Sequence, residues 1–112
     1  MGLYRLYTAD DGQSHIDDLD LNADEELKSP LAANSITFST WPPGQFIDWH
    51  PAPRRQYVIL LSGHLEIGLG DGTLRRFGPG DARLVEDTSG QGHTTRVIGD
   101  EPTVTAVIPL AD

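Results

Sequence analysis

The chain has 112 residues, a length that predicts one domain around a single hydrophobic core. Seventeen Asp and Glu residues against eight Lys and Arg residues give a formal net charge of −9, which disfavours nucleic acid and anionic membranes as partners. No cysteine is present, so disulfides and thiolate metal sites are excluded. The sequence has no secretory signal pattern and no apolar stretch of membrane-spanning length, and we expect a soluble, cytoplasmic protein.

Residues 1–34 are acidic and differ in composition from the remainder of the chain. Eight carboxylates fall in this segment: Asp10, Asp11, Asp17, Asp18, Asp20, Asp24, Glu25 and Glu26. A few isolated aliphatic residues, such as Ile16 and Leu27, stand between them. We expect a largely solvated segment with one or two short elements that packs on the domain core.

Residues 35–112 read as short strands separated by turns. The runs of strand length cover residues 36–41, 46–50, 56–61, 64–70, 74–77, 82–86, 93–98 and 103–108. Pro and Gly clusters separate them, and Asp71-Gly72 is a strong signal for a tight hairpin. No convincing helical period is present. About eight short strands predict an antiparallel all-β sandwich or barrel.

Four residues in this region resemble the first sequence motif of the cupins. Gly44, His50, Gln56 and Gly63 have the spacing of that motif's first glycine, first histidine, glutamate and last glycine. The chain departs from the motif twice, because Ala52 stands at the second histidine and Gln56 replaces the glutamate.

The second cupin motif is matched more loosely. Gly80 opens it, Glu86 takes the place of its proline, and after an insertion Gly90 and His93 restore its glycine-to-histidine step, while Val97 replaces its asparagine. The resemblance covers residues 44–97. It implies a double-stranded β-helix, a jelly roll of about eight or more antiparallel strands, in one cupin domain over residues 1–112, with residues 35–112 as the barrel. It also implies a homodimer, in which the apolar terminal segments either supply the paired edges or complete the sandwich.

Strand alternation predicts which side chains enter such a barrel, because residues i and i+2 share a face. Three inward-facing sets follow: Phe46, Asp48 and His50; Gln56, Val58 and Leu60; and His93, Thr95 and Val97. If all three sets face inward, they form an apolar floor with a polar cluster of Asp48, His50, Gln56 and His93. That composition is typical of a small-molecule pocket.

The polar cluster suggests a metal centre. At the two motif positions, His50 and His93 with Gln56 are the candidate ligands of a divalent first-row metal such as Fe, Mn, Ni or Zn, and Asp48 or Glu86 is the candidate fourth ligand or catalytic base. No organic cofactor is expected. The alternative is that each histidine is a buried imidazole bonded to a carbonyl group and that Gln56 is a core amide.

An arginine at the pocket mouth would select an anionic or enolic substrate. Arg54 and Arg55 should point in opposite directions, so at most one reaches the pocket, and the candidate substrate contacts are Arg54, Phe46, Val58 and Thr95.

Three functions stay open. The first is a metal-dependent, oxygenase-like enzyme. The second is a metal-free isomerase, epimerase or cyclase with a histidine base that a carboxylate orients. The third is a non-catalytic ligand-binding module.

Overall fold

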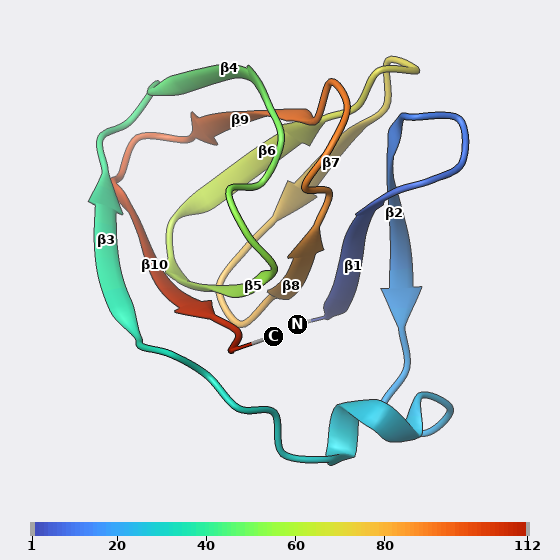
Figure 1. The fold of residues 1–112 in the computed structure, drawn as a ribbon. Helices are drawn as coiled ribbons and strands as arrows, with labels where there is room; N and C mark the ends of the chain where they lie inside the picture. Colours follow the sequence, from blue (N-terminus) through green and yellow to red (C-terminus); the bar gives the residue numbers. More distant parts are fainter. Residues whose placement is uncertain (1, 112) are drawn as a thin grey trace.

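The computed structural model describes residues 2–111, without the side chain of residue 26. Within this range the chain forms ten strands and one short 3₁₀ helix (Figure 1). In chain order they are β1 (Leu3–Thr8), β2 (Ser14–Leu19), η1 (Glu25–Lys28), β3 (Thr37–Trp41), β4 (Phe46–His50), β5 (Gln56–Ser62), β6 (His64–Gly68), β7 (Leu74–Phe77), β8 (Ala82–Glu86), β9 (His93–Ile98) and β10 (Thr103–Pro109). No helix in the described part of the chain is long and apolar enough to cross a lipid bilayer.

The strands form two facing sheets, which confirms the all-β jelly roll. The larger sheet has the order β2-β1-β8-β5-β10-β3, and the smaller sheet has the order β4-β9-β6-β7. All strand pairs are antiparallel except β1 with β8, which pair in parallel. Figure 1 shows the smaller sheet and the β5-β10-β3 side of the larger sheet enclosing one interior.

The acidic N-terminal segment is part of the larger sheet. The sequence predicts mostly loop there, but β1 and β2 pair along six residues each, from Leu3 opposite Leu19 to Thr8 opposite Ser14. Leu6 of β1 is only 1% exposed and belongs to the core. Asp17 and Asp18 of β2 lie at the solvent-facing edge of the sheet. Because their carboxylates interrupt the hydrophobic pattern of the sequence, that pattern does not predict a strand here.

The core fills the space between the two sheets and follows from alternation within each strand. In β6, Leu65 and Ile67 are buried and Glu66 between them is not. Phe77 of β7 and Leu60 of β5 pack in the same cluster. Burying a side chain of this size contributes roughly 1.5–3 kcal/mol, so this layer stabilises the packing of the two sheets against each other.

Candidate ligand pocket

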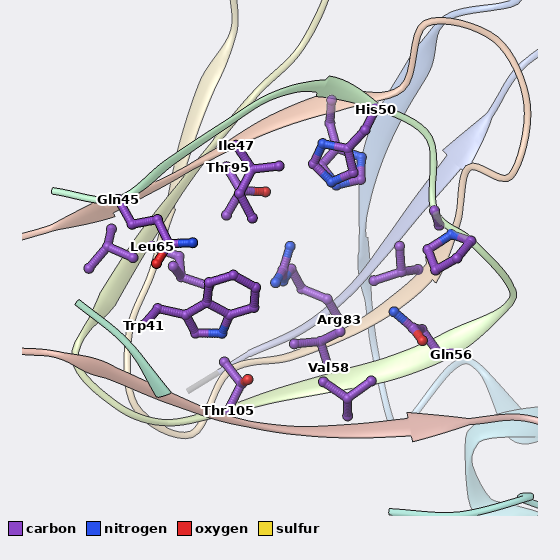
Figure 2. Close-up of a pocket in the computed structure, with 16 residues that line it drawn as sticks. Trp41, Gln45, Ile47, His50, Gln56, Val58, Leu65, Arg83, Thr95 and Thr105 are labelled. Atoms are coloured by element: carbon purple, nitrogen blue, oxygen red, sulfur yellow. The ribbon is translucent and has the colours of Figure 1, made fainter. Parts of the chain in front are cut away.

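A cavity of about 190 Å³ lies between the two sheets (Figure 2). Apolar side chains such as Val58, Val85 and Val97 form most of its wall. Its polar lining consists of Gln45, His50, Gln56, Arg83, His93, Thr95 and Thr105, together with the indole of Trp41. An apolar wall with a few convergent polar groups is typical of a site for a small organic molecule.

His50 and His93 lie side by side in this pocket. The two residues are directly opposite each other on β4 and β9, and their ring centroids are 4.6 Å apart. Gly92 permits this approach, because it has a φ of +78° and a Cβ at this position would overlap the carbonyl group of His50. The prediction that these two imidazoles, distant in sequence, meet inside the barrel is therefore confirmed.

Hydrogen bonds show which nitrogen of each imidazole ring is the donor. Nδ1 of His93 lies 2.6 Å from Oδ2 of Asp87, and Nδ1 of His50 lies 2.7 Å from the backbone carbonyl oxygen of Asp48. A carboxylate and a carbonyl oxygen accept hydrogen bonds, so Nδ1 carries a proton in each ring. Nε2 is therefore the nitrogen of each imidazole that is left for a ligand.

Asp87 is the carboxylate that orients His93. It is fully buried, and its Oδ2 also accepts a hydrogen bond from Oγ of Ser14 at 2.7 Å. Its second oxygen, Oδ1, is buried without a hydrogen-bond partner among the described residues. The sequence motifs select neither Asp87 nor Ser14. Asp87 lies just beyond β8, and only the fold brings it beneath His93.

Arg83 is the second charged group that the sequence motifs do not select. It is the second residue of β8, is 7% exposed and lines the pocket. Figure 2 shows its side chain extending into the pocket. Burial lowers the pKa of Arg83 to about 10, although the negative charges of Asp87 and Asp81 oppose this shift. A guanidinium so far removed from water is costly unless something pairs with it.

The structure does not bring Phe46 and Asp48 into the pocket, so the inward orientation expected for them is wrong. From Ile47 to His50 the chain advances three residues, while the paired positions on β9, Thr95 and His93, are two apart. This extra residue is a β-bulge, which reverses the alternation within β4. Ile47 therefore lines the pocket with His50.

The displaced residues lie outside the pocket lining. The Phe46 ring packs under the Arg96 guanidinium, 4.5 Å from its carbon. The exposed Asp48 carboxylate accepts a hydrogen bond from the Trp49 backbone N–H.

Glu86 and Arg54 also lie outside the pocket. Glu86 is on the opposite face of β8 from Arg83, where its two oxygens accept hydrogen bonds from Nε of Arg5 and Nε of Arg55, each at 2.5 Å. Arg54 is exposed and does not line the cavity. Of the two adjacent arginines, neither reaches the pocket, because Arg55 is held by Glu86. The catalytic and substrate roles expected for these residues have no geometric support.

Gln56, Val58 and Thr95 do line the pocket together with both histidines, and their roles as ligand contacts stay predictions. Leu60 is packed in the core instead. Trp41, which the sequence does not assign to the site, lines the pocket from the edge strand β3. In Figure 2 its indole lies across the cavity from His50.

Solved structures with the same architecture support the description of the fold. A protein with a double-stranded β-helix domain from Klebsiella pneumoniae aligns with a TM-score of 0.54 at 24% identity, over 67% of this chain and 64% of that chain. A cupin domain from Bordetella pertussis aligns with a TM-score of 0.54 at 18% identity, over 75% and 98% of the two chains. The chain has the cupin fold. The DMSP lyase DddQ from Ruegeria pomeroyi is another match, with a TM-score of 0.54 at 22% identity over 69% and 38% of the chains.

These comparisons establish the fold and nothing further. No family model matches the sequence, and no curated protein matches it. The chain spans less than two thirds of the length of the Klebsiella and Ruegeria structures. What the pocket does must therefore be argued from its own residues.

The histidine pair has no third His, Cys, Asp or Glu beside it to complete a metal site, among the residues that the structure describes. Two imidazoles offer Nε2, but the described residues contain no group of three His, Cys, Asp or Glu side chains that could hold a metal ion. A mononuclear iron site of the oxygenase type uses two histidines and a carboxylate, and no carboxylate is part of the pocket lining. The Arg83 cation in the same cavity further opposes a second positive charge.

Proposed function

We propose that the protein is a metal-independent acid–base enzyme that moves a proton on a small organic molecule bound in the barrel. The observation that carries this proposal is the 2.6 Å hydrogen bond from Nδ1 of His93 to the buried Asp87 carboxylate. That bond holds the ring in the tautomer whose Nε2 can accept a proton, and it stabilises the imidazolium that results. It corresponds to a histidine base oriented by a carboxylate, the second of the three functions that the sequence leaves open.

The reaction needs no external oxidant or reductant. Nε2 of His93 takes a proton from a C–H group next to a carbonyl, and the electron pair moves onto the carbonyl oxygen to give an enolate. The same His93 imidazolium then returns its proton to the substrate. Because the two rings are on one wall, 4.6 Å apart, the arrangement favours proton return to the same face of the substrate, as in an isomerase.

Deuterium exchange tests this proposal directly, because it detects proton abstraction whether or not a new product forms. The protein is incubated in D₂O with 2-oxobutyrate, and incorporation of deuterium at the carbon next to the ketone is followed by NMR. We expect exchange well above the buffer rate, and a loss of about 10²- to 10⁴-fold in His93→Gln. Asp87→Asn should also slow exchange, whereas Glu66→Gln, which alters an acid paired with Arg76 outside the pocket, should not.

Thermal unfolding of each variant separates a chemical loss from a folding defect. Exchange at the buffer rate with the wild-type protein, or full exchange in a folded His93→Gln variant, would contradict the assignment of His93.

A metal-dependent, oxygenase-like enzyme is the competing proposal. One observation favours it: both imidazoles have Nδ1 occupied, so both Nε2 atoms are available to one bound ion. Metal analysis of protein purified without an affinity tag decides between the two proposals. Near-stoichiometric iron, manganese, nickel or zinc that is lost in His50→Ala supports the metal enzyme. Deuterium exchange that persists in metal-free protein supports the acid–base enzyme.

A further inference from the structure

The position of Arg83 is unusual for a charged side chain. The residue is 7% exposed and lines the pocket. Arginine is almost never buried to this extent unless it is paired. A natural sequence that keeps such a group in its barrel needs a reason beyond packing, because an apolar side chain of the same volume would fill the space at a lower energy.

No carboxylate of the described residues forms an ion pair with this guanidinium. The nearest acids that act on it, Asp87 and Asp81, are engaged elsewhere. Asp87 binds Ser14 and His93, and Asp81 accepts hydrogen bonds from the backbone N–H groups of Gly2 and Gly78. The Phe77 ring, with its centroid 5.3 Å from the guanidinium carbon, contributes a cation–π contact but cannot accept the N–H bonds.

The other polar groups in the pocket can donate hydrogen bonds. Gln56, Thr95 and Thr105 line it with Arg83, and no Asp or Glu does. Oγ1 of Thr105 is buried without a hydrogen-bond partner in the part of the chain that the structure describes. One unpaired cation, several side-chain donors and no anion together make a cavity that is electrostatically complementary to a negatively charged guest.

We propose that the pocket binds a small monocarboxylate and that Arg83 holds its carboxylate group through two parallel N–H bonds. This inference rests on the proposed function in treating the pocket as a substrate site, and it adds the class of substrate. Guanidinium and carboxylate match in a planar, bidentate geometry. A single guanidinium among valine side chains suits a monoanion with an apolar body better than a phosphate dianion.

Binding of isobutyrate and its neutral isostere isobutyramide tests the proposal by calorimetry, and benzoate with benzamide forms a second pair. We expect each carboxylate to bind at least roughly tenfold more tightly than its amide. Arg83→Met should weaken carboxylate binding by roughly 10- to 100-fold, and Arg83→Lys should weaken it less because it keeps the charge but not the fork. Inorganic phosphate should bind more weakly than either carboxylate.

Equal binding of acid and amide, undiminished binding by a folded Arg83→Met variant, tighter binding of phosphate, or no binding of any carboxylate would each overturn the inference. The His93→Gln variant separates this test from that of the proposed function. Carboxylate binding that survives in His93→Gln, with no deuterium exchange even in the wild-type protein, would leave a carboxylate-binding site without the proposed chemistry. Deuterium exchange that depends on His93 but not on Arg83 would support proton abstraction by His93 and contradict carboxylate binding by Arg83.

Discussion

At the level of single residues, two buried charges give the pocket its chemistry. Asp87 accepts hydrogen bonds from Ser14 and His93 through its Oδ2 atom. Arg83 has no such neighbours, and burial lowers its pKa to about 10. The first charge orients the His93 ring, and the second lines the pocket. Replacing each of these two charged groups by a neutral one should therefore change the free energy of unfolding in opposite directions.

We predict that Arg83→Met stabilises the ligand-free protein. Methionine has a similar length and leaves no charge to desolvate, so the free energy of unfolding should rise by about 1–3 kcal/mol. Denaturant-induced unfolding measures this change. Arg96→Met is the matched control, because Arg96 is exposed over the Phe46 ring and should change stability by no more than about 1 kcal/mol. A destabilised Arg83→Met protein would show that the guanidinium is a structural group rather than one reserved for a ligand.

At the level of elements, the pocket depends on the pairing of β4 with β9 and on the turn that precedes β9. Gly92 enters that turn with positive φ, and its α-carbon faces the His50 carbonyl group. A side chain at this position would push the two strands apart just where the imidazoles meet. The geometry of the histidine pair is therefore set by a residue that has no side chain.

We predict that Gly92→Ala destabilises the fold by more than about 3 kcal/mol and separates the two histidines. Gly99→Ala is the control, because Gly99 also has positive φ, +86°, but has open space where a Cβ would lie. The free energy of unfolding of Gly99→Ala should fall by only about 1–2 kcal/mol, the cost of placing an alanine at positive φ. Chemical denaturation gives both values. Equal losses in the two variants would mean that the close approach to His50 has no energetic consequence.

The same elements show how far the sequence predicts the structure. Runs such as residues 56–61 and 93–98 are correctly predicted as strands, because an apolar run between turn residues is a local signal. The facing direction of β4 is not predictable, because the bulge between Ile47 and His50 exists only against β9. In β8, alternation alone shows that Arg83 and Glu86 point in opposite directions, but only the sheet order shows that Arg83 is the inner one.

At the level of the whole molecule, the two terminal strands are interior strands. β1 lies between β2 and β8, and β10 lies between β5 and β3, so the apolar ends of the chain complete the sandwich rather than supply free edges. The larger sheet ends at β3, which has no further strand beyond it among the described residues. This edge and the outer face beside it are the surface at which a second copy could pair.

Charge distribution singles out this surface. The strands β5, β10 and β3 contain no charged residue, in a chain whose net charge is −9. Phe38, Ala106 and Ile59 are cross-strand neighbours and so share the outer face, on which Ala106 is buried. Phe38 is 65% exposed and Leu61 is 48% exposed. An uncharged apolar face beside an open edge is typical of an interface between copies.

We predict a homodimer in which two β3 edges pair about a twofold axis and the outer apolar faces continue each other. Sedimentation equilibrium should give a dimer mass for the wild-type protein, and Phe38→Glu should shift the mass to that of the monomer, because it places two carboxylates in a desolvated contact. Leu74→Glu is the control, since Leu74 is equally exposed, at 62%, but belongs to β7 of the smaller sheet. It should leave the dimer intact. A wild-type monomer, or a dimer that is broken by Leu74→Glu and not by Phe38→Glu, would place the interface elsewhere or remove it.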